Sequence, residues 1–515
     1  MRPKTCLFTG LALLLLTGCK AENKTKDTVK PNIIFILADD LGYGDLGCYG
    51  QELIETPNID ALASAGILFT QHYSGSPVCA PSRCVLLTGL HSGHAYIRGN
   101  DEWGERGDVW DYLAMIKDPT LEGQRPLPPH TTTIGTLMQS AGYRTGMTGK
   151  WGLGAPHTEG IPNEQGFDFF CGYNCQRQAH TYYPVHLYLN RERMYLGNDT
   201  VAPHTELEVG ADPYGQDSYA PYTLSSYAPD VMFDQMIRFI EEGEGKPFFF
   251  YWASPIPHVA LQAPQRWVEY YVEKFGDEVP YAGDQGYFPC RYPHATYAAM
   301  VSYLDERVGE LVSFLKQKNL YDNTLIIFSS DNGPTYNGGT DSPWFDSGGP
   351  FRSGQGWAKG SLHEGGIRVP LIACWPGKIE PGRESGHLSA FWDLLPTLCE
   401  VSGAGLPPQA DGISYLPELL GEGGQQKHPY LYWEFPESGG QQAVRMGDWK
   451  AIRKNIRQGN LELELYNLSA DIQEHQDVAG DHPELVRQMM QIMKEEHQPS
   501  ELEVFRIKAL DGRGS

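Results

Sequence analysis

The sequence is short of basic residues. It carries 40 Lys and Arg against 64 Asp and Glu, which gives a formal net charge of −24. A general binder of nucleic acids or anionic membranes needs a basic face, so this balance argues against both functions and predicts no nucleic-acid partner. A small anionic substrate remains compatible with it, because a local cluster of Arg, Lys and metal can invert the field inside one pocket.

Clustered cysteines, internal repeats and a membrane-spanning run are also missing. The ten cysteines are scattered, and the only close pair, Cys171 and Cys175, lacks the neighbouring Cys or His of a zinc site. Beyond the N-terminal segment, no apolar run is long enough to cross a bilayer. A length of 515 residues with 41% apolar residues therefore predicts a large globular protein of more than one domain.

The first nineteen residues are typical of an export signal. Arg2 and Lys4 precede the apolar run 7–16, which leads into Cys19. This ending resembles a bacterial lipoprotein box and implies lipidation of Cys19; a plain secretory signal is the alternative. Residues 20–30 have the composition of a polar tether. We expect an extracytoplasmic, lipid-anchored protein that faces the periplasm or the cell exterior.

Four apolar runs have the pattern of parallel strands buried on both faces, and they predict an α/β fold. They cover residues 32–37, 143–147, 247–253 and 324–328. Apolar residues at helical spacing between 297 and 315 predict a helix that covers the sheet. Thr56 and Pro57 predict a short helix capped by the threonine.

Oxygen-bearing side chains follow the first and the last of these runs. Asp39 and Asp40 come after one strand, and Asp331 and Asn332 come after the other. Open α/β sheets bind ligands at the carboxyl ends of their strands, so the two pairs can bracket one cation. An oxygen-only set favours calcium or magnesium over zinc. Each pair alone would more often be a solvated turn.

Cys79-Ala80-Pro81-Ser82-Arg83 opens a short apolar run that closes at Thr88-Gly89. The proline places Cys79 in the first turn of a helix, where free N–H groups and the helix dipole favour an anion. Arg83 follows one turn later, so its guanidinium can lean back towards Cys79. An ordinary buried cysteine is the alternative interpretation.

This stretch resembles the signature of the type I, formylglycine-dependent sulfatases, the family of arylsulfatases and N-acetylgalactosamine sulfatases. The resemblance implies an alkaline-phosphatase-like sandwich, in which a large, mostly parallel central sheet is flanked by helices. It also implies that a separate maturation enzyme oxidises Cys79 to formylglycine, which is hydrated in the resting site. The implied metal is Ca²⁺, with Mg²⁺ possible, bound by Asp39, Asp40, Cys79, Asp331 and Asn332.

Further residues match motifs of the same family. Lys150, between two glycines, and Lys359 resemble its sulfate-binding lysines. His258 resembles the histidine that protonates the leaving oxygen, and Arg83 would hold the diol by hydrogen bonds. The family commonly has a histidine where this chain has Gly152. The chain therefore departs from the family pattern at the residue that assists sulfate release.

The expected substrate is a sulfated carbohydrate, such as a fragment of a glycosaminoglycan, a mucin or an algal glycan. Residues 160–235 are rich in Tyr, Asn, Gly and Pro, a composition typical of a long binding loop. The candidate substrate contacts are His94, Arg98, Asn100, Gln176 and His180. Two other functions remain open: a phosphate- or phosphonate-ester hydrolase of the same superfamily, and a non-catalytic glycan-binding lipoprotein.

Four segments make up the predicted organisation. A signal peptide covers 1–19, a tether 20–30, a catalytic domain 31–419 and a C-terminal subdomain 420–515. Short alternating runs after residue 430 predict a small antiparallel sheet in this last segment. An amphipathic run that begins near Asp481 predicts one helix packed on that sheet.

Overall fold

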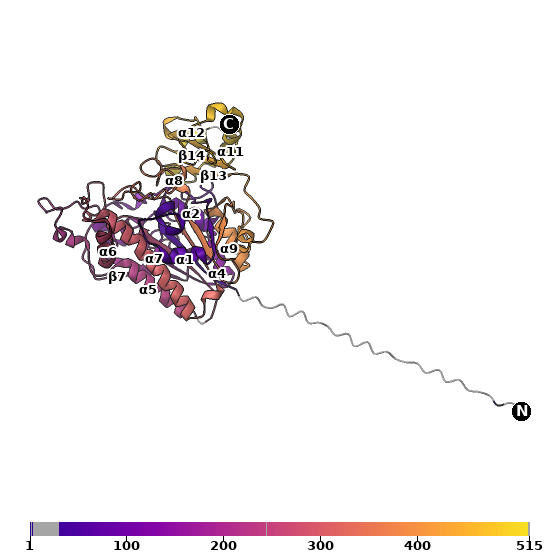
Figure 1. Ribbon diagram of the computed structural model, residues 1–515, viewed down its shortest axis with the longest axis horizontal. Helices are drawn as coiled ribbons and strands as arrows, with labels where there is room; N and C mark the ends of the chain where they lie inside the picture. The colour runs from indigo at the N-terminus through magenta and orange to yellow at the C-terminus, as the bar shows by residue number, and fades with distance from the viewer. Residues whose placement is uncertain (2, 4–29, 244, 513–515) are drawn as a thin grey trace. The chain divides into compact units, whose positions relative to one another are not determined.

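A ten-stranded sheet forms the centre of the molecule (Figure 1). This computed structural model describes residues 1, 3, 30–243 and 245–512. The strand order is β11-β2-β10-β9-β1-β8-β4-β5-β6-β7. The four central strands are parallel and correspond to the four predicted runs. They are β9 (Thr324–Ser330), β1 (Asn32–Asp39), β8 (Phe248–Pro257) and β4 (Arg144–Lys150).

The outer strands give the sheet its mixed character. β5 continues the parallel part beyond β4, whereas β6, β7 and β10 pair antiparallel with their neighbours. At the far edge, β11 pairs in parallel with β2. The predicted large, mostly parallel sheet is confirmed. The bounds of these strands are Ile67–Phe69 for β2, Phe169–Tyr173 for β5, His186–Leu189 for β6, Glu192–Tyr195 for β7, Leu371–Cys374 for β10 and Arg383–Ser385 for β11.

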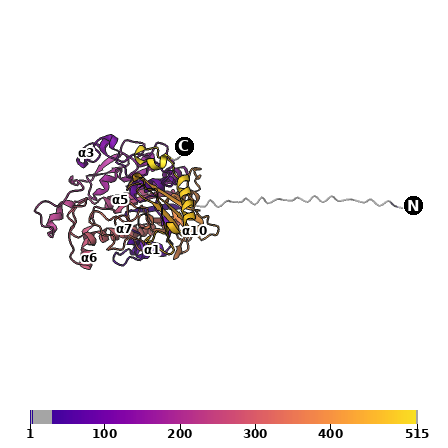
Figure 2. The ribbon, with the colours of Figure 1, turned by 90° about the horizontal axis from the view of Figure 1, so that it is seen from above.

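Helices cover both faces of the sheet. Because side chains alternate along a strand, Ile33, Phe35 and Leu37 of β1 face one layer and Ile34 and Ile36 face the other. The first layer contains α2 (Cys79–Thr88), α4 (Ile134–Ser140) and α9 (Leu394–Ser402). The second contains α1 (Pro57–Ser64), α5 (Ala228–Glu241), α6 (Gln265–Phe275) and the predicted long helix α7 (Pro293–Gln317). Figures 1 and 2 show α1, α5 and α7 gathered on the same side.

Thr56 stands at the N-cap position of α1 and Pro57 in its first turn, as predicted, but the threonine side chain does not cap the helix. The hydroxyl of Thr56 accepts a hydrogen bond from Gly47 N–H instead of from the helix. The first N–H groups of α1, those of Asn58 and Ile59, donate to the carboxylate of Asp305 on α7. A side chain far along the chain therefore caps this helix.

A small antiparallel sheet follows in the C-terminal part, as predicted. Its strands are β13 (Leu431–Phe435), β14 (Gln441–Met446), β15 (Trp449–Arg453) and β16 (Glu464–Asn467). The predicted helix is α11 (Pro483–Glu495), whose apolar residues Met489, Ile492 and Met493 pack on this sheet. The division at residue 419 stays a prediction.

Contacts from the C-terminal part hold the segment that carries Lys359. Gln441 accepts a hydrogen bond from Leu362 N–H and donates one to Gly360 O. Glu474 accepts from Glu364 N–H at 2.8 Å. The segment that directly follows Lys359, from Gly360 to Glu364, is thereby fixed to the C-terminal part.

Lys450 of β15 bridges this segment and the C-terminal part. Its ammonium is fully buried and lies 2.8 Å from Glu364 and 3.2 Å from Glu474. Burial works to raise the pKa of Glu474, but Lys450 and His363 outweigh it and lower that pKa to about 2. The bridge therefore joins charges that water does not reach.

The described cysteines, Cys48, Cys79, Cys84, Cys171, Cys175, Cys290, Cys374 and Cys399, are free thiols. Among the described residues, no helix has the length and apolarity needed to cross a membrane. Cys19, the signal peptide and most of the tether lie outside the described residues. Lipidation, export and the extracytoplasmic location stay predictions.

Replacing Lys450 with Met should destabilise the protein strongly, because two carboxylates would stay buried without their shared cation. We expect a loss of about 3–5 kcal/mol in the free energy of unfolding, measured by urea denaturation. The pKa of Glu474 is lower in the folded state, so its carboxylate stabilises the unmodified protein fully above pH 4.5 and loses this effect as the pH falls towards 2. The variant should lack this pH-dependent part of the stability.

Lys318→Met is the control, since its side chain is 47% exposed and pairs with Glu241 at the surface. It should cost less than about 1 kcal/mol. Equal losses in the two variants would contradict the importance of the buried bridge.

Candidate active site

Four adjacent strand ends deliver polar side chains to one edge of the central sheet. β9, β1, β8 and β4 are neighbours in that order, and their carboxyl ends lead to Asp331, Asp39, His258 and Lys150. All four side chains are buried. Parallel pairing is what brings these residues together, because it turns every strand end to the same side.

Cys79 begins α2 and points into this edge. It is 1% exposed, and its Sγ lies 3.2 Å from Asp39 Oδ1 and 3.5 Å from Lys150 Nζ. Val78 precedes it in extended conformation, so the chain enters the helix at Cys79, as predicted. Burial and the Asp39 carboxylate raise the pKa of the thiol well above its ordinary value. Cys79 therefore carries a protonated thiol in this environment.

The acidic residues form a tight cluster around a backbone turn. Asp40 has a φ of +65°, a left-handed conformation that Asp tolerates, and its N–H donates to Asp331 Oδ1 at 3.1 Å. The amide of Asn332 donates to Asp40 Oδ1 at 2.7 Å. The other atom of that amide, Asn332 Oδ1, is buried and accepts no hydrogen bond from the described residues.

Three cations face the three carboxylates. Lys150 Nζ lies 2.6 Å from Asp39, Lys359 Nζ lies 2.7 Å from Asp40, and Arg83 lies 2.9 Å from Asp331. Arg83 also reaches Asp39 at 3.2 Å. Burial disfavours the charged ammonium of Lys150, but the neighbouring groups, Asp39 first among them, together outweigh burial and raise its pKa. All three cations stay protonated.

This donor set fits a hard divalent cation. Asp39, Asp40, Cys79 and His258 each offer an atom within 4.8 Å of the others. Asn332 Oδ1 is a buried oxygen whose hydrogen-bonding capacity is unused, and the carboxylates supply further oxygens. Carboxylate and amide oxygens are the ligands that calcium and magnesium prefer.

His258 stands beside the cluster with a defined tautomer. Its Nδ1 faces the carbonyl oxygen of Val259, which can only accept, so the neutral ring carries its proton on Nδ1. Its Nε2 lies 3.7 Å from Asp40 Oδ2. Burial, Lys150 and Lys359 lower the pKa of His258 well below its ordinary value. The free nitrogen therefore faces the site.

The structure groups three of the five predicted substrate contacts near this cluster. Asn100 Oδ1 accepts hydrogen bonds from Ala80 N–H at 3.0 Å, next to Cys79, and from Gln176 Nε2 at 3.2 Å. The ring of His180 stacks on that of His258, with centroids 5.4 Å apart.

The other two predicted contacts are held elsewhere. His94 lies 3.0 Å from Asp411, and Arg98 is buried between Glu434 at 3.1 Å and the carbonyl oxygen of Gln498. These interactions attach the segment after α2 to later parts of the chain. A substrate-binding role for His94 and Arg98 stays a prediction that their contacts do not support.

Gln176 fills the space beside Gly152. Gly152 has a φ of +79°, and a Cβ on it would come 2.8 Å from Cγ of Gln176. A side chain at position 152 would therefore displace the glutamine. Gln176 Oε1 is buried and accepts no hydrogen bond within the described chain.

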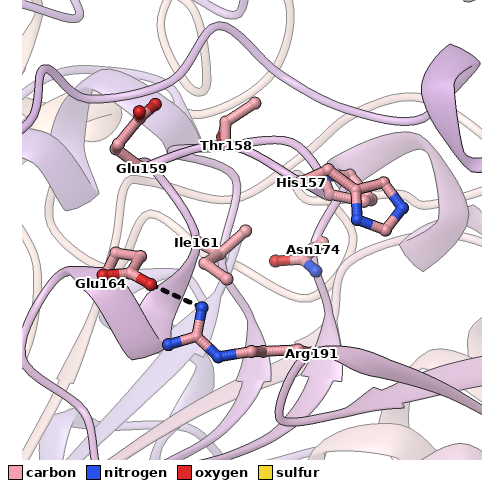
Figure 3. A pocket seen from close by; sticks show the side chains of 8 residues that line it. His157, Thr158, Glu159, Ile161, Glu164, Asn174 and Arg191 are labelled. Carbon is pink, nitrogen blue, oxygen red and sulfur yellow. Dashed lines mark hydrogen bonds and ion pairs between the residues drawn. The ribbon is translucent and has the colours of Figure 1, made fainter.

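A separate hollow of about 260 Å³ is lined mainly by the segment between β4 and β5 (Figure 3). Arg191 and Glu164 form an ion pair at one side of it, and Asn174 lies near its centre. Its lining contains none of the predicted site residues; it consists of Pro156, His157, Thr158, Glu159, Ile161, Glu164, Asn174 and Arg191. This hollow is distinct from the cluster around Cys79.

The family profile described as sulfatase matches residues 31–404. The chain belongs to the sulfatase family. It is a sulfuric ester hydrolase, as its sequence predicted. A second profile, that of the C-terminal part of N-sulphoglucosamine sulphohydrolase, matches residues 355–499 of this sulfatase.

Known sulfatases are similar to it over most of its length. Arylsulfatase A of Homo sapiens is 32% identical over 432 residues, which are 82% of this chain and 74% of that protein. The N-acetylgalactosamine-6-O-sulfatase of Bacteroides thetaiotaomicron is 29% identical over 533 residues, 95% of this chain and 97% of that one. The crystal structure of Ps i-CgsB superposes with a TM-score of 0.70 at 28% identity and covers 91% of this sulfatase and 94% of that chain. The predicted family and fold are confirmed, whereas the individual residue roles stay predictions.

Asp40→Asn should weaken calcium binding, because it removes one negative charge from the oxygen cluster. We expect the dissociation constant for Ca²⁺ of chelator-treated protein to rise by about 10–100-fold in titration calorimetry. Asp234→Asn, on an exposed position of α5, is the control and should leave the affinity unchanged. An unaltered Ca²⁺ affinity in the Asp40 variant would remove this residue from the metal site.

Proposed function

We propose that this sulfatase hydrolyses sulfate esters of carbohydrates, with residue 79 as its nucleophile after conversion to formylglycine. One observation carries the proposal: Cys79 Sγ lies between a carboxylate cluster and the ammonium of Lys150, at the buried ends of four parallel strands. A thiol with a raised pKa is a poor nucleophile, so the residue needs conversion before it can attack sulfur.

Sγ of Cys79 stands where the two oxygens of the hydrated aldehyde would lie. Formylglycine would supply a hydroxyl that attacks the sulfur atom, and the second hydroxyl of the hydrate would lose its proton and re-form the aldehyde as the C–O bond to sulfate breaks. Ca²⁺, held by Asp39, Asp40, Asp331 and Asn332, would supply positive charge for the sulfate oxygens. Mg²⁺ is the alternative occupant. Arg83 orients Asp39 and Asp331 through its ion pairs.

Lys150 and Lys359 would bind the sulfate group. Both ammonium groups lie at the cluster, bonded to Asp39 and Asp40. Negative charge spreads over the sulfate oxygens during transfer, and two fixed cations stabilise it, as cationic clamps do in phosphoryl transfer. Asn100, Gln176 and His180 would then contact the sugar.

His258 would protonate the oxygen of the departing sugar from Nε2. Its pKa is lowered by burial and by the two lysines. The bound sulfate ester carries negative charge next to these lysines and would offset their effect, which favours the imidazolium. As the S–O bond to the sugar breaks, the proton on Nε2 passes to the sugar oxygen.

Its relatives support a carbohydrate substrate. One is an N-acetylgalactosamine-6-O-sulfatase, and Ps i-CgsB was crystallised with k-i-k-neocarrahexaose. Both resemble this chain over more than nine tenths of its length. We infer a sulfated glycan fragment as the substrate.

Export and maturation belong to the same proposal. The N-terminal sequence supports transfer out of the cytoplasm and a lipid anchor at Cys19. A maturation enzyme would act on Cys79, which is buried in the folded chain. The maturation enzyme would therefore have to act before the chain folds.

Cys79→Ala should lower turnover of an aryl sulfate by about 10³-fold or more, because the nucleophile is lost. Cys84→Ala, on the same helix, is the control and should keep the activity per folded molecule, with folding checked by circular dichroism. The mass of the peptide that contains residue 79 should show the aldehyde in active protein. Full activity of the Cys79 variant, or of a preparation that carries only the thiol, would overturn the nucleophile assignment.

His258→Ala should slow alkyl sulfates by about 10²–10⁴-fold. Activated aryl sulfates should lose much less, because their leaving oxygen needs no proton. His475→Ala, on an exposed position, is the control and should leave both rates as they are. Equal losses for both substrate types would exclude His258 as the acid.

A further inference from the structure

Six side chains lead from the catalytic cluster to the protein surface: four rings contact one another, and the short segment Gln176–His180 connects them to Arg177, which contacts Trp110. We call them the aromatic row; its members, in order outwards, are His258, His180, Tyr287, His204, Arg177 and Trp110. They come from five separate segments of the chain. His258 is buried, whereas His204 and Trp110 are exposed. The row therefore joins the reacting centre to solvent.

Ring contacts hold the inner part together. His180 stacks on His258 with an interplanar angle of 15°. Tyr287 meets both rings edge-on, with centroids 5.0 Å from His180 and 5.8 Å from His258. His204 packs on Tyr287 at 4.7 Å. These contacts fix the position of each ring relative to the next.

Hydrogen bonds define which ring nitrogen of His204 and of His180 carries the proton. The N–H of Tyr287 donates to His204 Nδ1 at 3.1 Å, so His204 carries its proton on Nε2. That proton goes to His180 Nδ1 at 2.9 Å, and His180 therefore carries its own proton on Nε2. A neutral imidazole with one free N–H presents a flat face and a single donor. The donor suits a sugar hydroxyl, and the flat face can pack against the sugar ring.

Trp110 forms the outer end of the row. Its side chain is 61% exposed, which is unusual for so large an apolar ring. The guanidinium of Arg177 lies 4.5 Å from the ring centroid and also donates to the carbonyl oxygen of Trp110. Arg177 thus holds the ring in place from one side. It belongs to the same short segment, Gln176–His180, that carries two of the predicted substrate contacts.

The row begins on the side where the sugar leaves. His258 would protonate the leaving oxygen, so the sulfated sugar lies next to His258 during the reaction. The sugars attached to it must extend away from the sulfate pocket. The rigid surface that continues from His258 is the aromatic row.

We propose that the aromatic row binds the sugars next to the sulfated one, with Trp110 stacking against one of them, so that oligosaccharides are the preferred substrates. The inference rests on the proposed carbohydrate function. Aromatic rings bind sugars through their flat apolar faces, and Trp110 offers the largest such face along the row. Small sulfate esters would fill the pocket without reaching it.

The test compares substrates of different length in one enzyme. We would measure kcat/KM for a sulfated monosaccharide and for the tetrasaccharide that carries the same sulfated sugar, over a panel of sulfated galactose and galactosamine glycans. The ratio of tetrasaccharide to monosaccharide does not depend on the fraction of active protein. In the unmodified enzyme this ratio should exceed one.

Trp110→Ala should lower that ratio by about 10-fold, mainly through a higher KM for the tetrasaccharide. Trp110→Phe keeps a flat ring and should restore most of it. Trp344→Ala is the matched control, because Trp344 is 42% exposed and lies outside the row; it should leave the ratio as it is.

Two results would overturn the inference. A ratio of one in the unmodified enzyme, or an unchanged ratio in Trp110→Ala, would show that the row binds no sugar, while carbohydrate hydrolysis stands. If aryl sulfates are hydrolysed and no saccharide of the panel is, the proposed function itself fails and the inference falls with it.

Discussion

The active site depends on a balance of buried charges. Three carboxylates, Asp39, Asp40 and Asp331, face the cations Arg83, Lys150 and Lys359, and all of these side chains are buried except that of Lys359, which is 17% exposed. An unpaired charge in such a place costs several kcal/mol, so no member of this set is dispensable without loss. The same balance serves binding: a divalent cation and an anionic group can enter as a pair and leave the net charge nearly unchanged. The overall acidity of the protein is therefore no obstacle to an anionic substrate.

Much of this centre follows from the sequence. Apolar runs that end in Asp39-Asp40 and in Asp331-Asn332 indicated both the parallel strands and the place where their polar ends meet. The position of Cys79 at the start of a helix followed from Pro81 and the apolar run. Each of these features is visible in a short stretch of sequence. Parallel pairing of the strands then brings the polar residues at the strand ends together in one site. The positions of Lys150 and His258 can be predicted in the same way, since Lys150 ends one central strand and His258 directly follows another.

Other features could not be read from the sequence, because they depend on contacts between distant segments. Thr56 has the right position for a cap, yet Asp305 caps the helix from another element. His94 and Arg98 follow the helix of Cys79 closely, but their side chains are held by Asp411 and Glu434. Tyr287, His204 and Trp110 lie in irregular segments without periodicity. Only the folded chain brings them into a row.

The hydrogen bonds that Gln441 forms with Gly360 and Leu362, just after Lys359, join two distant stretches of the chain into a single unit. Every residue assigned to chemistry precedes position 360, yet the lysine that faces Asp40 is held by a sheet that begins after position 430. A fragment cut before that sheet would contain all of these residues, but the segment that carries Lys359, which we propose to bind sulfate, would lack these contacts. Substitutions near Gln441 can therefore move the Lys359 ammonium and change the proposed binding of sulfate, although Gln441 itself does not contact the sulfate.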